Sequence, residues 1–526
     1  MSRRFRGLKH EPNDSYDAVV IGAGVGGLVC ANLLVRAGLR VLLVEQHFMV
    51  GGYCSTFRRK GYTFDAATHF YPLLGNANTI TGALLGRLGV TSEWIKMDPV
   101  DHFHFPDGTH FSVPADFASY LAKLLREFPE ESQAIQDFFA VVRKTYFLGL
   151  LHHFRGAETE RLAPYRDLTI GGVLSSYFRS PKLKLLLTGD IGHWGSPPSR
   201  TSFVFDSMLR LAYFLGNYYP RGGSQSFVDE LAGQFEDRGG HVLMSSLVRR
   251  IHIQGRTACG VEIETGPAKR RFLIQVRCGA VISNADIIQT LEKMIGEDLL
   301  DSDYLELVKK LRPTNPCFLV HLGLRDVGAE ELRRVEGYHW SCWDPEKVAT
   351  QAFKIFVPTL LDPTIAPPGG QIIIVQKQTA IDYECISDWP SHKAAVEKYI
   401  FSNLERVMPG ISERMVVKLS ATAQTSYRYT LNHRGAMLGW ELSPDQLSER
   451  RPQIQSPFEN LYFVGHWSRP GGGITPVMVS AMRAADLIIG NRKAQAPSLS
   501  GLADLRAEVA SHDHLRELSS REEQTW

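Results

Sequence analysis

The stretch DAVVIGAGVGGLVCANLLVRAGLRVLLVEQ, residues 17–46, joins an apolar run, three spaced glycines and a glutamate near its end. Its first part, Ala18 to Ile21, is short and rich in valine, which is typical of a strand buried on both faces. Gly22, Gly24 and Gly27 follow as G-x-G-x-x-G. This order predicts a strand, a tight glycine turn and a helix.

Each part of this pattern has a place in a unit that binds a dinucleotide. Gly22 permits the turn, Gly24 lets the backbone approach a pyrophosphate, and Gly27 lets the helix pack close to the strand. Apolar residues recur with helical period as far as Gly38, a natural stop for a helix. A second strand then leads to Glu45, whose carboxylate can accept hydrogen bonds from ribose hydroxyls. The sequence therefore predicts a dinucleotide-binding unit; the alternative is a purely structural glycine turn.

Two further glycine-rich segments bear on which dinucleotide binds, because NAD and FAD both fit the first unit. Gly51 and Gly52 follow the glutamate closely, and such a second loop indicates a cofactor larger than NAD. Near the other end, residues 460–490 predict a strand, a turn from Gly465 to Gly473 and a helix capped by Thr475. A helix N-terminus that points at a ligand favours negative charge, as on a reduced flavin. These features favour FAD.

Several separated stretches resemble one family of flavoproteins. In chain order they are GYTFDAATHF (61–70), YYPRGGSQSFVDELAGQFEDRGGHVLMSSLVRRI (218–251), VISNAD (281–286) and SYRYTLNHRGAMLGW (426–440). Together with the first unit and the Gly465 turn, they resemble the FAD-dependent phytoene desaturase, carotenoid isomerase and retinol saturase group of the amine-oxidase-like flavoproteins. The resemblance spans nearly the whole chain from Asp17 to Gly490. It implies an FAD enzyme that acts on a long apolar polyene.

The resemblance also implies roles for single residues. Val248 is similar to the family position whose backbone meets the adenine, and the helix N-terminus near Ile474 would face the flavin. His466 stands where many relatives have an acid that accepts a ribityl hydroxyl, and an imidazole can accept too. A second departure is AATHF, residues 66–70, where saturases have a glycine before the histidine region. That departure leaves open whether the reaction is isomerisation, saturation or desaturation.

The positions of the cofactor segments predict the domain organisation. The fold class is α/β, with a discontinuous Rossmann-type FAD-binding domain and an inserted α+β substrate domain. The FAD-binding domain is expected at residues 15–75, 217–290 and 455–493. The substrate domain is expected at 76–216 and 291–454, between an N-terminal extension (1–14) and a polar tail (494–526).

Composition narrows the class of partner. The 526 residues include 58 basic and 56 acidic residues, so the net charge of +2 argues against nucleic acid as the main partner. The seven cysteines form no C-x-x-C pair, and we expect no metal site. The N-terminus has no apolar stretch typical of a secretory signal, and no run is long enough to span a membrane. We expect a peripheral protein on the cytoplasmic side of a membrane; the oligomeric state is not predicted.

The first insertion contains an unusually apolar stretch, DFFAVVRKTYFLGLLHHF, at residues 137–154. It is interpreted either as a buried core helix or as an apolar mouth that dips into a bilayer, with its basic residues at the headgroups. A very apolar substrate would have to leave a membrane, which favours the second interpretation.

Three side chains are candidates for catalysis. His69 follows an expected strand that ends at Asp65 and is a candidate to face the flavin, or else is a hydrogen-bonded structural histidine. His193 lies in a loop rich in glycine and proline, next to Trp194, which either stacks on a polyene or caps a core. Arg434 lies in the late motif and either reaches the site or holds a loop carboxylate.

The flavin itself would do the redox work while the protein supplies orientation and a dry pocket. Two alternatives to a polyene enzyme remain. One is an amine-oxidase-like or ketolase-like flavoenzyme on another apolar substrate, and the other is a flavin-containing protein that binds pigment without turnover.

Overall fold

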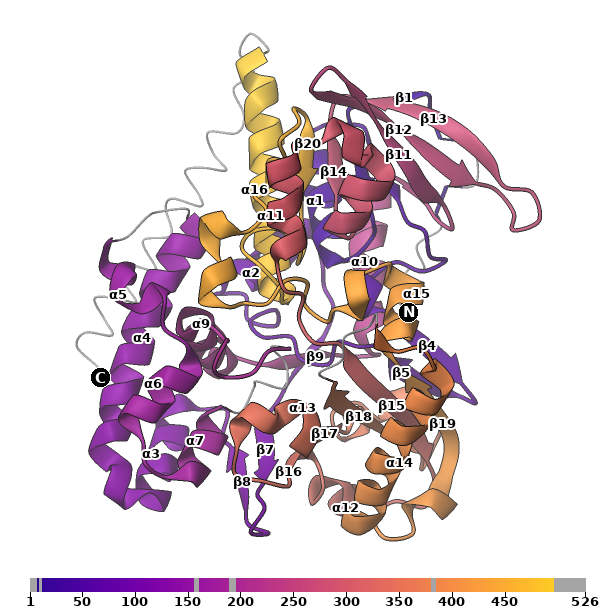
Figure 1. Cartoon of the computed structure of the whole chain (residues 1–526). Coiled ribbons are helices and arrows are strands. Elements are labelled where there is room, and N and C mark those ends of the chain that lie inside the picture. Colours follow the sequence, from indigo (N-terminus) through magenta and orange to yellow (C-terminus); the bar gives the residue numbers. More distant parts are fainter. Residues whose placement is uncertain (1–6, 9–11, 156–159, 189–194, 380–384, 496–526) are drawn as a thin grey trace. The chain divides into compact units, whose positions relative to one another are not determined.

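The computed structural model describes residues 7–8, 12–155, 160–188, 195–379 and 385–495 (Figure 1). The chain divides into two compact units, residues 1–484 and 485–526. Helix α16 (Ile474–Gln495) begins in the first unit and supplies the described part of the second. The mixed α/β fold class predicted from the sequence is confirmed.

A five-stranded parallel sheet draws its strands from distant parts of the sequence. Their order is β10 (His241–Leu243), β3 (Val41–Val44), β2 (Ala18–Ile21), β14 (Val281–Ser283) and β20 (Leu461–Phe463). The residues of β2 and β3 are all buried, as the valine-rich runs predicted. The strand after the first helix is Val41–Val44, so Glu45 follows its last residue.

Helices cover this sheet at the point where the phosphate loop is expected. Helix α1 (Val25–Arg36) follows β2 directly and packs on α10 (Ser224–Glu236). The Asn32 side-chain amide joins them, because it donates to the carbonyls of Leu28 and Leu231 at 2.9 Å each. Gly38 follows the helix with a φ of +85°, in agreement with the predicted stop.

A smaller, four-stranded sheet flanks the five-stranded one. It has the order β1 (Ser15–Tyr16), β13 (Phe272–Cys278), β12 (Thr257–Thr265) and β11 (Leu247–Gln254). Its strands are antiparallel except that β1 pairs with β13 in parallel. Two short ribbons form separate two-stranded sheets. They are β4 (Thr56–Arg59) with β5 (Tyr62–Asp65), and β6 (Trp94–Lys96) with β9 (Tyr218–Pro220).

A seven-stranded mixed sheet forms the other main layer. Its order is β19 (Met415–Ala421), β15 (Cys317–Leu324), β18 (Gln371–Gln378), β17 (Ala352–Phe356), β16 (Gly337–Trp340), β7 (Asp101–His104) and β8 (His110–Val113). Residues alternate between two cores along β18. Ile373 and Val375 belong to the core that contains α14 (Trp389–Val407), while Ile372 and Ile374 belong to the core that contains Tyr219.

The remaining helices of the first unit lie outside these sheets. They are α2 (Ile80–Leu88), α3 (Phe117–Glu127), α4 (Ser132–Arg155), α5 (Ala163–Arg166), α6 (Ile170–Tyr177), α7 (Pro181–Leu187), α9 (Phe203–Phe214), α11 (Ser302–Lys310), α12 (Ala329–Arg333), α13 (Val348–Gln351) and α15 (Ala423–Thr430). Helices α3, α4, α6 and α7 lie together in Figure 1 and share one apolar core with α9.

Helix α4 fits both interpretations offered by its sequence. Phe138, Phe139 and Val142 are fully buried in the helical core. Phe147 and Leu151, farther along the same helix, are 38% and 39% exposed. Among the described residues, no helix is both long enough and apolar enough to cross a membrane.

Candidate active site

The first glycine loop has the geometry that its spacing predicts. Gly22 has a φ of +93°, and its N–H donates to the carbonyl of Val44 at 2.8 Å. A Cβ at Gly27 would lie 2.0 Å from the Gly22 carbonyl oxygen, so only glycine permits this approach of helix to strand. The first turn of α1 therefore follows the end of β2 with its N–H groups at the loop.

The carboxylate of Glu45 secures this loop from the neighbouring strand. One oxygen accepts the Ala23 N–H at 2.7 Å and the other accepts the His47 N–H at 2.8 Å. Burial raises the pKa of Glu45, and these hydrogen bonds oppose that effect. Each carboxylate oxygen keeps further acceptor capacity, so binding a ribose hydroxyl remains compatible with this arrangement.

The second glycine loop lies against the first. The Gly51 N–H donates to the Ala23 carbonyl at 2.8 Å, and Gly24 and Gly51 form a parallel bridge. Gly51 and Gly52 have φ values of +111° and +57°. A Cβ at Gly52 would lie 3.5 Å from the Gly24 Cα. Two loops that the sequence separates by a strand and a helix thus form one glycine surface.

The Asn284 side chain, which sequence reasoning did not single out, borders this surface. A Cβ at Gly24, Gly26 or Gly465 would lie 2.9, 2.6 or 2.7 Å from it. Asn284 follows β14, which is the parallel neighbour of β2 on the side opposite β3. The connection therefore changes side between β2 and β14, and ligands bind at such switch points of parallel sheets.

The C-terminal turn reaches the same place. The Gly465 N–H donates to the Ser480 hydroxyl at 2.9 Å. The Nε2 of His466 lies 3.2 Å from Oδ1 of Asn432, and burial together with Arg451 lowers the pKa of His466 to about 4. The ring is therefore neutral near pH 7 and can accept a hydrogen bond. Helix α16 begins at Ile474, one residue before the predicted cap at Thr475.

Val248 lies two residues after Ser246, which bonds to Glu45. It is buried in β11, and the N–H of Ser246, just before that strand, donates to the Glu45 carbonyl at 2.9 Å. The proposed adenine contact of its backbone stays a prediction. Two glycine loops, a helix N-terminus and an acid at a strand end are the groups that a dinucleotide requires, so the residues present fit one.

Comparison with known proteins agrees with this geometry. Residues 25–489 match the family model described as flavin containing amine oxidoreductase. The chain belongs to this family. A flavin cofactor and oxidoreductase chemistry follow from that membership.

Relatives that match most of this chain are named for three different reactions. Prolycopene isomerase of Daucus carota is 26% identical over 89% of this chain and 79% of its own. All-trans-retinol 13,14-reductase of Rattus norvegicus is 27% identical over 86% of this chain and 82% of its own. Phytoene desaturase (lycopene-forming) of Pantoea ananas is 26% identical over 89% of this chain and 98% of its own. The resemblance seen in the sequence is thereby confirmed.

Solved structures share the fold. An oxidoreductase from Methanosarcina mazei has a TM-score of 0.65 at 18% identity and covers 89% of this chain and 99% of its own. Putrescine oxidase bound to putrescine has a TM-score of 0.63 at 14% identity and covers 91% of this chain and 100% of its own.

The catalytic candidates lie on separate elements. His69 is buried shortly after β5 and stacks on Phe356, with ring centroids 5.1 Å apart. Arg434 has a φ of +55° in the turn after α15, and the neighbouring His433 N–H donates to Oδ2 of Asp286 at 2.7 Å. His193 and Trp194 lie outside the described residues. The roles given to His69, His193 and Arg434 stay predictions.

A buried network around Asp65 holds the segment that contains His69. Asp65 accepts the Tyr219 hydroxyl at 2.6 Å and the Ser224 N–H, at the start of α10, at 2.7 Å. The Nε2 of His321 lies 2.9 Å from the Asp65 carbonyl oxygen. Burial raises the pKa of Asp65 and lowers that of His321 to about 4. These residues lie within the quoted family stretches, apart from His321, for which the sequence offered no signal.

A buried ion pair joins strands β17 and β7 of the seven-stranded sheet. Nζ of Lys354 lies 2.6 Å from the Asp101 carboxylate, and the two side chains are 2% and 9% exposed. The ammonium also lies 3.9 Å from the ring centroid of Phe70 and 4.6 Å from that of Tyr338. Lys354 lines a cavity of about 10 Å³ with Cys317 and other side chains. The sequence does contain a signal for this pair, because Lys354 is the one charged residue in the otherwise apolar strand AFKIF.

A series of contacts leads from this cavity to the start of α16. A Cβ at Gly472 would lie 2.3 Å from the Leu438 carbonyl oxygen, and the Leu438 N–H donates to the Thr314 hydroxyl at 2.9 Å. Thr314 lies just before β15, whose first residue, Cys317, lines the cavity. On the other side, the Thr475 hydroxyl lies 3.5 Å from the carbonyl oxygen of Pro72, near Phe70.

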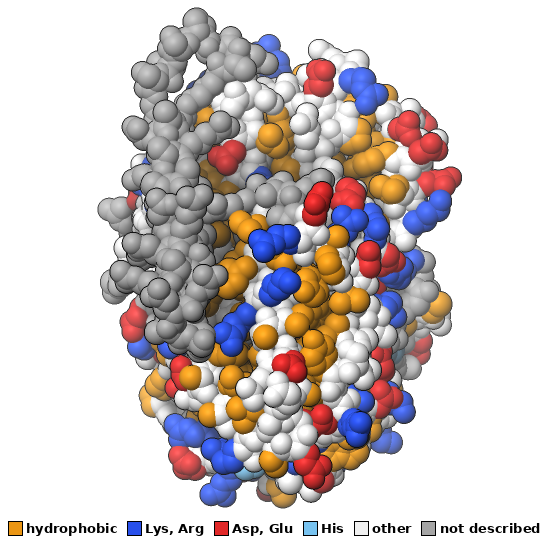
Figure 2. All heavy atoms as spheres, turned by 90° about the vertical axis from the view of Figure 1, so that its left-hand side faces the viewer, with side chains coloured by type: hydrophobic (Ala, Val, Ile, Leu, Met, Phe, Trp, Pro, Cys, Tyr) orange, Lys and Arg blue, Asp and Glu red, His pale blue; other side chains and the backbone are white. Residues whose placement is uncertain are grey.

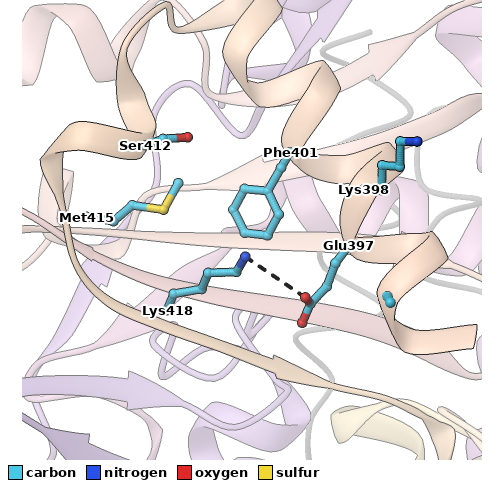
Figure 3. Close-up of a pocket in the computed structure, with 7 residues that line it drawn as sticks. Glu397, Lys398, Phe401, Ser412, Met415 and Lys418 are labelled. Carbon is cyan, nitrogen blue, oxygen red and sulfur yellow. Dashed lines mark ion pairs between the residues drawn. The ribbon is translucent and has the colours of Figure 1, made fainter. Parts of the chain in front are cut away.

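The larger groove of the structure is a different feature. It has a volume of about 570 Å³ and lies between α14 and β19. Figure 3 shows Lys418 directed toward Glu397, 3.9 Å away, beside Phe401. None of its lining residues belongs to the glycine loops, so the cofactor site lies elsewhere. The described residues contain no group of His, Cys, Asp and Glu suited to a metal ion.

Proposed function

We propose that the chain is an FAD enzyme that acts on carbon–carbon double bonds of a long apolar polyene, such as a carotenoid or retinoid. The observation that carries this proposal is that relatives named for prolycopene, retinol and phytoene all match along most of the chain. Their three substrates are conjugated or polyunsaturated isoprenoids, whereas their named reactions differ. The substrate class is therefore better supported than the direction of the reaction.

FAD is the flavin that the site fits best. The first glycine loop and Glu45 suit the adenosine half, and Gly465, His466 and the N-terminus of α16 suit the flavin half. Val248 is proposed to meet the adenine through its backbone. Acid or heat should release the cofactor, because no histidine or cysteine stands in an evident flavin-linking motif. Recovery of NAD alone after gentle purification would contradict this assignment.

The side chains around the site have assigned tasks in this proposal. A bound flavin supplies hydride exchange with a carbon atom of the substrate. The aromatic rings of Phe70, Phe356 and Tyr338 exclude water and offer flat apolar surfaces to a polyene. The Lys354–Asp101 pair places one fixed dipole against that surface, and His69 lies beside Phe356. The cavity of about 10 Å³ is too small for a polyene, so binding requires these side chains to move.

Isomerisation or saturation is the reaction that we favour, because GYTFDAATHF (61–70) is similar to the corresponding stretch of the saturases, apart from the glycine that they have before the histidine region. The test is anaerobic incubation of a cis-polyene with oxidised enzyme and then with pre-reduced enzyme. Conversion by reduced enzyme at constant hydrogen count supports isomerisation, and a gain of two hydrogens supports saturation. Product formed only by oxidised enzyme, with two hydrogens lost, would establish desaturation instead.

Peripheral attachment to the cytoplasmic side of a membrane completes the proposal. An apolar polyene partitions into the bilayer, so an enzyme that binds it benefits from contact with that surface. The face that includes α4 shows a band of hydrophobic side chains with Lys and Arg among them (Figure 2). Phe147 and Leu151 are the partly exposed apolar residues of α4.

A flavoenzyme that oxidises another apolar substrate is the second candidate. The fold shared with putrescine oxidase favours it. A screen of amines with oxidised enzyme and of polyenes with pre-reduced enzyme would separate the two. An amine substrate bleaches the oxidised flavin under anaerobic conditions, whereas a polyene substrate is isomerised or gains two hydrogens.

A further inference from the structure

Four basic side chains gather at the C-terminal end of α4, beside the Gly465–Gly473 turn, where a Cβ at Gly471 would lie 2.2 Å from Nη1 of Arg451. They are His153, Arg451, Arg469 and Arg483, and we call them the basic cluster. They come from α4, the turn before β20, the turn after β20 and α16. His153 and Arg451 are 2% and 1% exposed, whereas Arg469 and Arg483 are partly buried. The cluster thus extends from the interior toward the surface.

Hydrogen bonds between these segments bring the cluster together. Next to His153, the Nε2 of His152 lies 2.9 Å from the hydroxyl of Ser448, and the Arg451 N–H donates to the Ser448 carbonyl at 3.4 Å. Nη1 of Arg451 donates at 3.3 Å to the carbonyl of Pro470, the residue after Arg469. Burial lowers the pKa of His153, and the charges of His152 and of the three arginines lower it further.

The charge of this cluster has little compensation within the protein. Within the described residues, His153 Nδ1, Arg451 Nε, Arg469 Nε and Arg483 Nη2 are buried nitrogen atoms without a hydrogen-bond partner. Neither Asp nor Glu in that part of the chain forms an ion pair with the three arginines. Glu449 is near enough for Arg469 to contribute to lowering its pKa, but its side chain is 61% exposed and lies 3.7 Å from Arg166. Gln453 Oε1 accepts from Arg469 at 3.4 Å.

Buried guanidinium groups without a counter-charge are costly, and an anion that bonds to their free nitrogen atoms removes that cost. The unbonded donors belong to four different elements of the chain. A tetrahedral oxyanion offers oxygens in several directions, and guanidinium groups bind phosphate oxygens in pairs. A carboxylate, with two oxygens in one plane, would satisfy fewer of these donors.

We propose that the basic cluster is a binding site for a phosphate group. The nearby exposed side chains on α4, Phe147 and Leu151, are suited to the apolar part of a phospholipid, so the phosphate belongs either to an anionic lipid headgroup or to a soluble ion. The proposed ligand is separate from the flavin, although Arg469 lies in the turn assigned to that cofactor.

The first experiment measures inorganic phosphate binding to the purified flavoprotein. Calorimetry should detect phosphate binding at constant ionic strength, and the double variant Arg469→Gln/Arg483→Gln should weaken it by about a hundredfold, or tenfold for each charge-assisted pair lost. Glu449→Gln should strengthen binding, because it removes the nearest negative charge. The matched control is Arg450→Gln, since Arg450 lies 3.5 Å from Asp167 and outside the cluster. Its phosphate affinity should be that of the wild type.

A second measurement does not depend on variants that fold. Phosphate should slow the modification of Arg469 and Arg483 by phenylglyoxal in the wild-type protein, as followed by mass spectrometry, and leave Arg450 unaffected. Absence of phosphate binding by the wild type, or binding that the double variant retains, would overturn the proposal. The flavin content of each variant is measured in parallel, because Arg469 lies in the turn assigned to the flavin. Loss of phosphate binding with the flavin retained separates this result from a failure of the proposed enzyme function.

The source of the phosphate is tested with vesicles. If the ligand is a lipid headgroup, the wild type should bind phosphatidylcholine vesicles that contain 20% phosphatidic acid more tightly than pure phosphatidylcholine vesicles. Free phosphate should then compete with the vesicles for binding. The double variant should then lose the difference. Phosphate binding with equal affinity for both vesicles supports a soluble phosphate at the same site.

Discussion

The two main sheets of the first unit place their polar groups differently. In the parallel sheet, the groups of the dinucleotide site follow strand ends, with Gly22 after β2, Glu45 after β3 and Asn284 after β14. In the seven-stranded sheet, His321 and Lys354 lie buried within strands. A site at strand ends depends on loops, and one on a sheet face depends on register. Binding of the cofactor and packing against the substrate should therefore respond to different substitutions.

Gly24→Val should have the largest effect, because it acts on a strand-end loop. A Cβ at this position already lies 2.9 Å from the Asn284 side chain, and the valine methyl groups would occupy the space of a pyrophosphate. We expect complete loss of flavin, measured as the ratio of flavin to protein absorbance, in a protein that keeps its far-ultraviolet circular dichroism. Gly233→Ala is the control, since a Cβ there meets nothing within 4 Å. Normal flavin content in Gly24→Val would show that this loop does not bind phosphate.

Lys354→Met should have the second largest effect and should act on stability. Removing one partner of a buried ion pair leaves the other charge uncompensated, at a cost of about 3–5 kcal/mol. The double variant Lys354→Met/Asp101→Leu should recover part of that loss. The control is Lys310→Met, because Lys310 and its partner Glu306 are 76% and 69% exposed and such exposed pairs contribute little to stability. Equal thermal midpoints for Lys354→Met and Lys310→Met would contradict the importance of the buried pair.

The difference between the sheets also explains what the sequence could predict. Residues 17–46 contain a strand, a turn, a helix and an acid in direct succession. The dinucleotide unit and the position of Glu45 could therefore be predicted from the sequence alone. Asn284 reaches the loop only because β14 pairs with β2, and its side-chain amide lies 262 residues from Gly22 along the chain. Lys354 and Asp101 are 253 residues apart and meet through the register of β16, β17 and β7. Such pairings follow from the fold and have no local signal.

A third prediction concerns pH and the segment after β14. Burial raises the pKa of Asp286 from 3.8 to about 7, although backbone N–H groups of Gln289 and His433 oppose this. The folded protein thus binds a proton here that the unfolded chain has released. Its stabilising contribution is fully present below about pH 4 and is lost as the pH rises through 7. Relative to the wild type, Asp286→Asn should become steadily more stable as the pH rises from 5 to 8. Parallel profiles of thermal midpoint against pH for the wild type and Asp286→Asn would contradict this assignment. Glu336, whose pKa is also raised to about 7, is present in both proteins and does not affect the difference between them.

The smallest effect on stability is expected for substitutions on the exposed side of α4, which test binding to a membrane surface. Phe147 and Leu151 are 38% and 39% exposed, so replacing both by serine should cost far less than the about 3–5 kcal/mol lost when a buried phenylalanine is removed. If this face enters a bilayer, the double variant should keep its flavin and its thermal midpoint within a few degrees, yet no longer float with liposomes. The control is Phe138→Ser on the same helix, where the side chain is fully buried and the protein should unfold. Liposome binding that survives the double substitution would assign membrane contact to another face, and unfolding of the double variant would show that these side chains belong to the core.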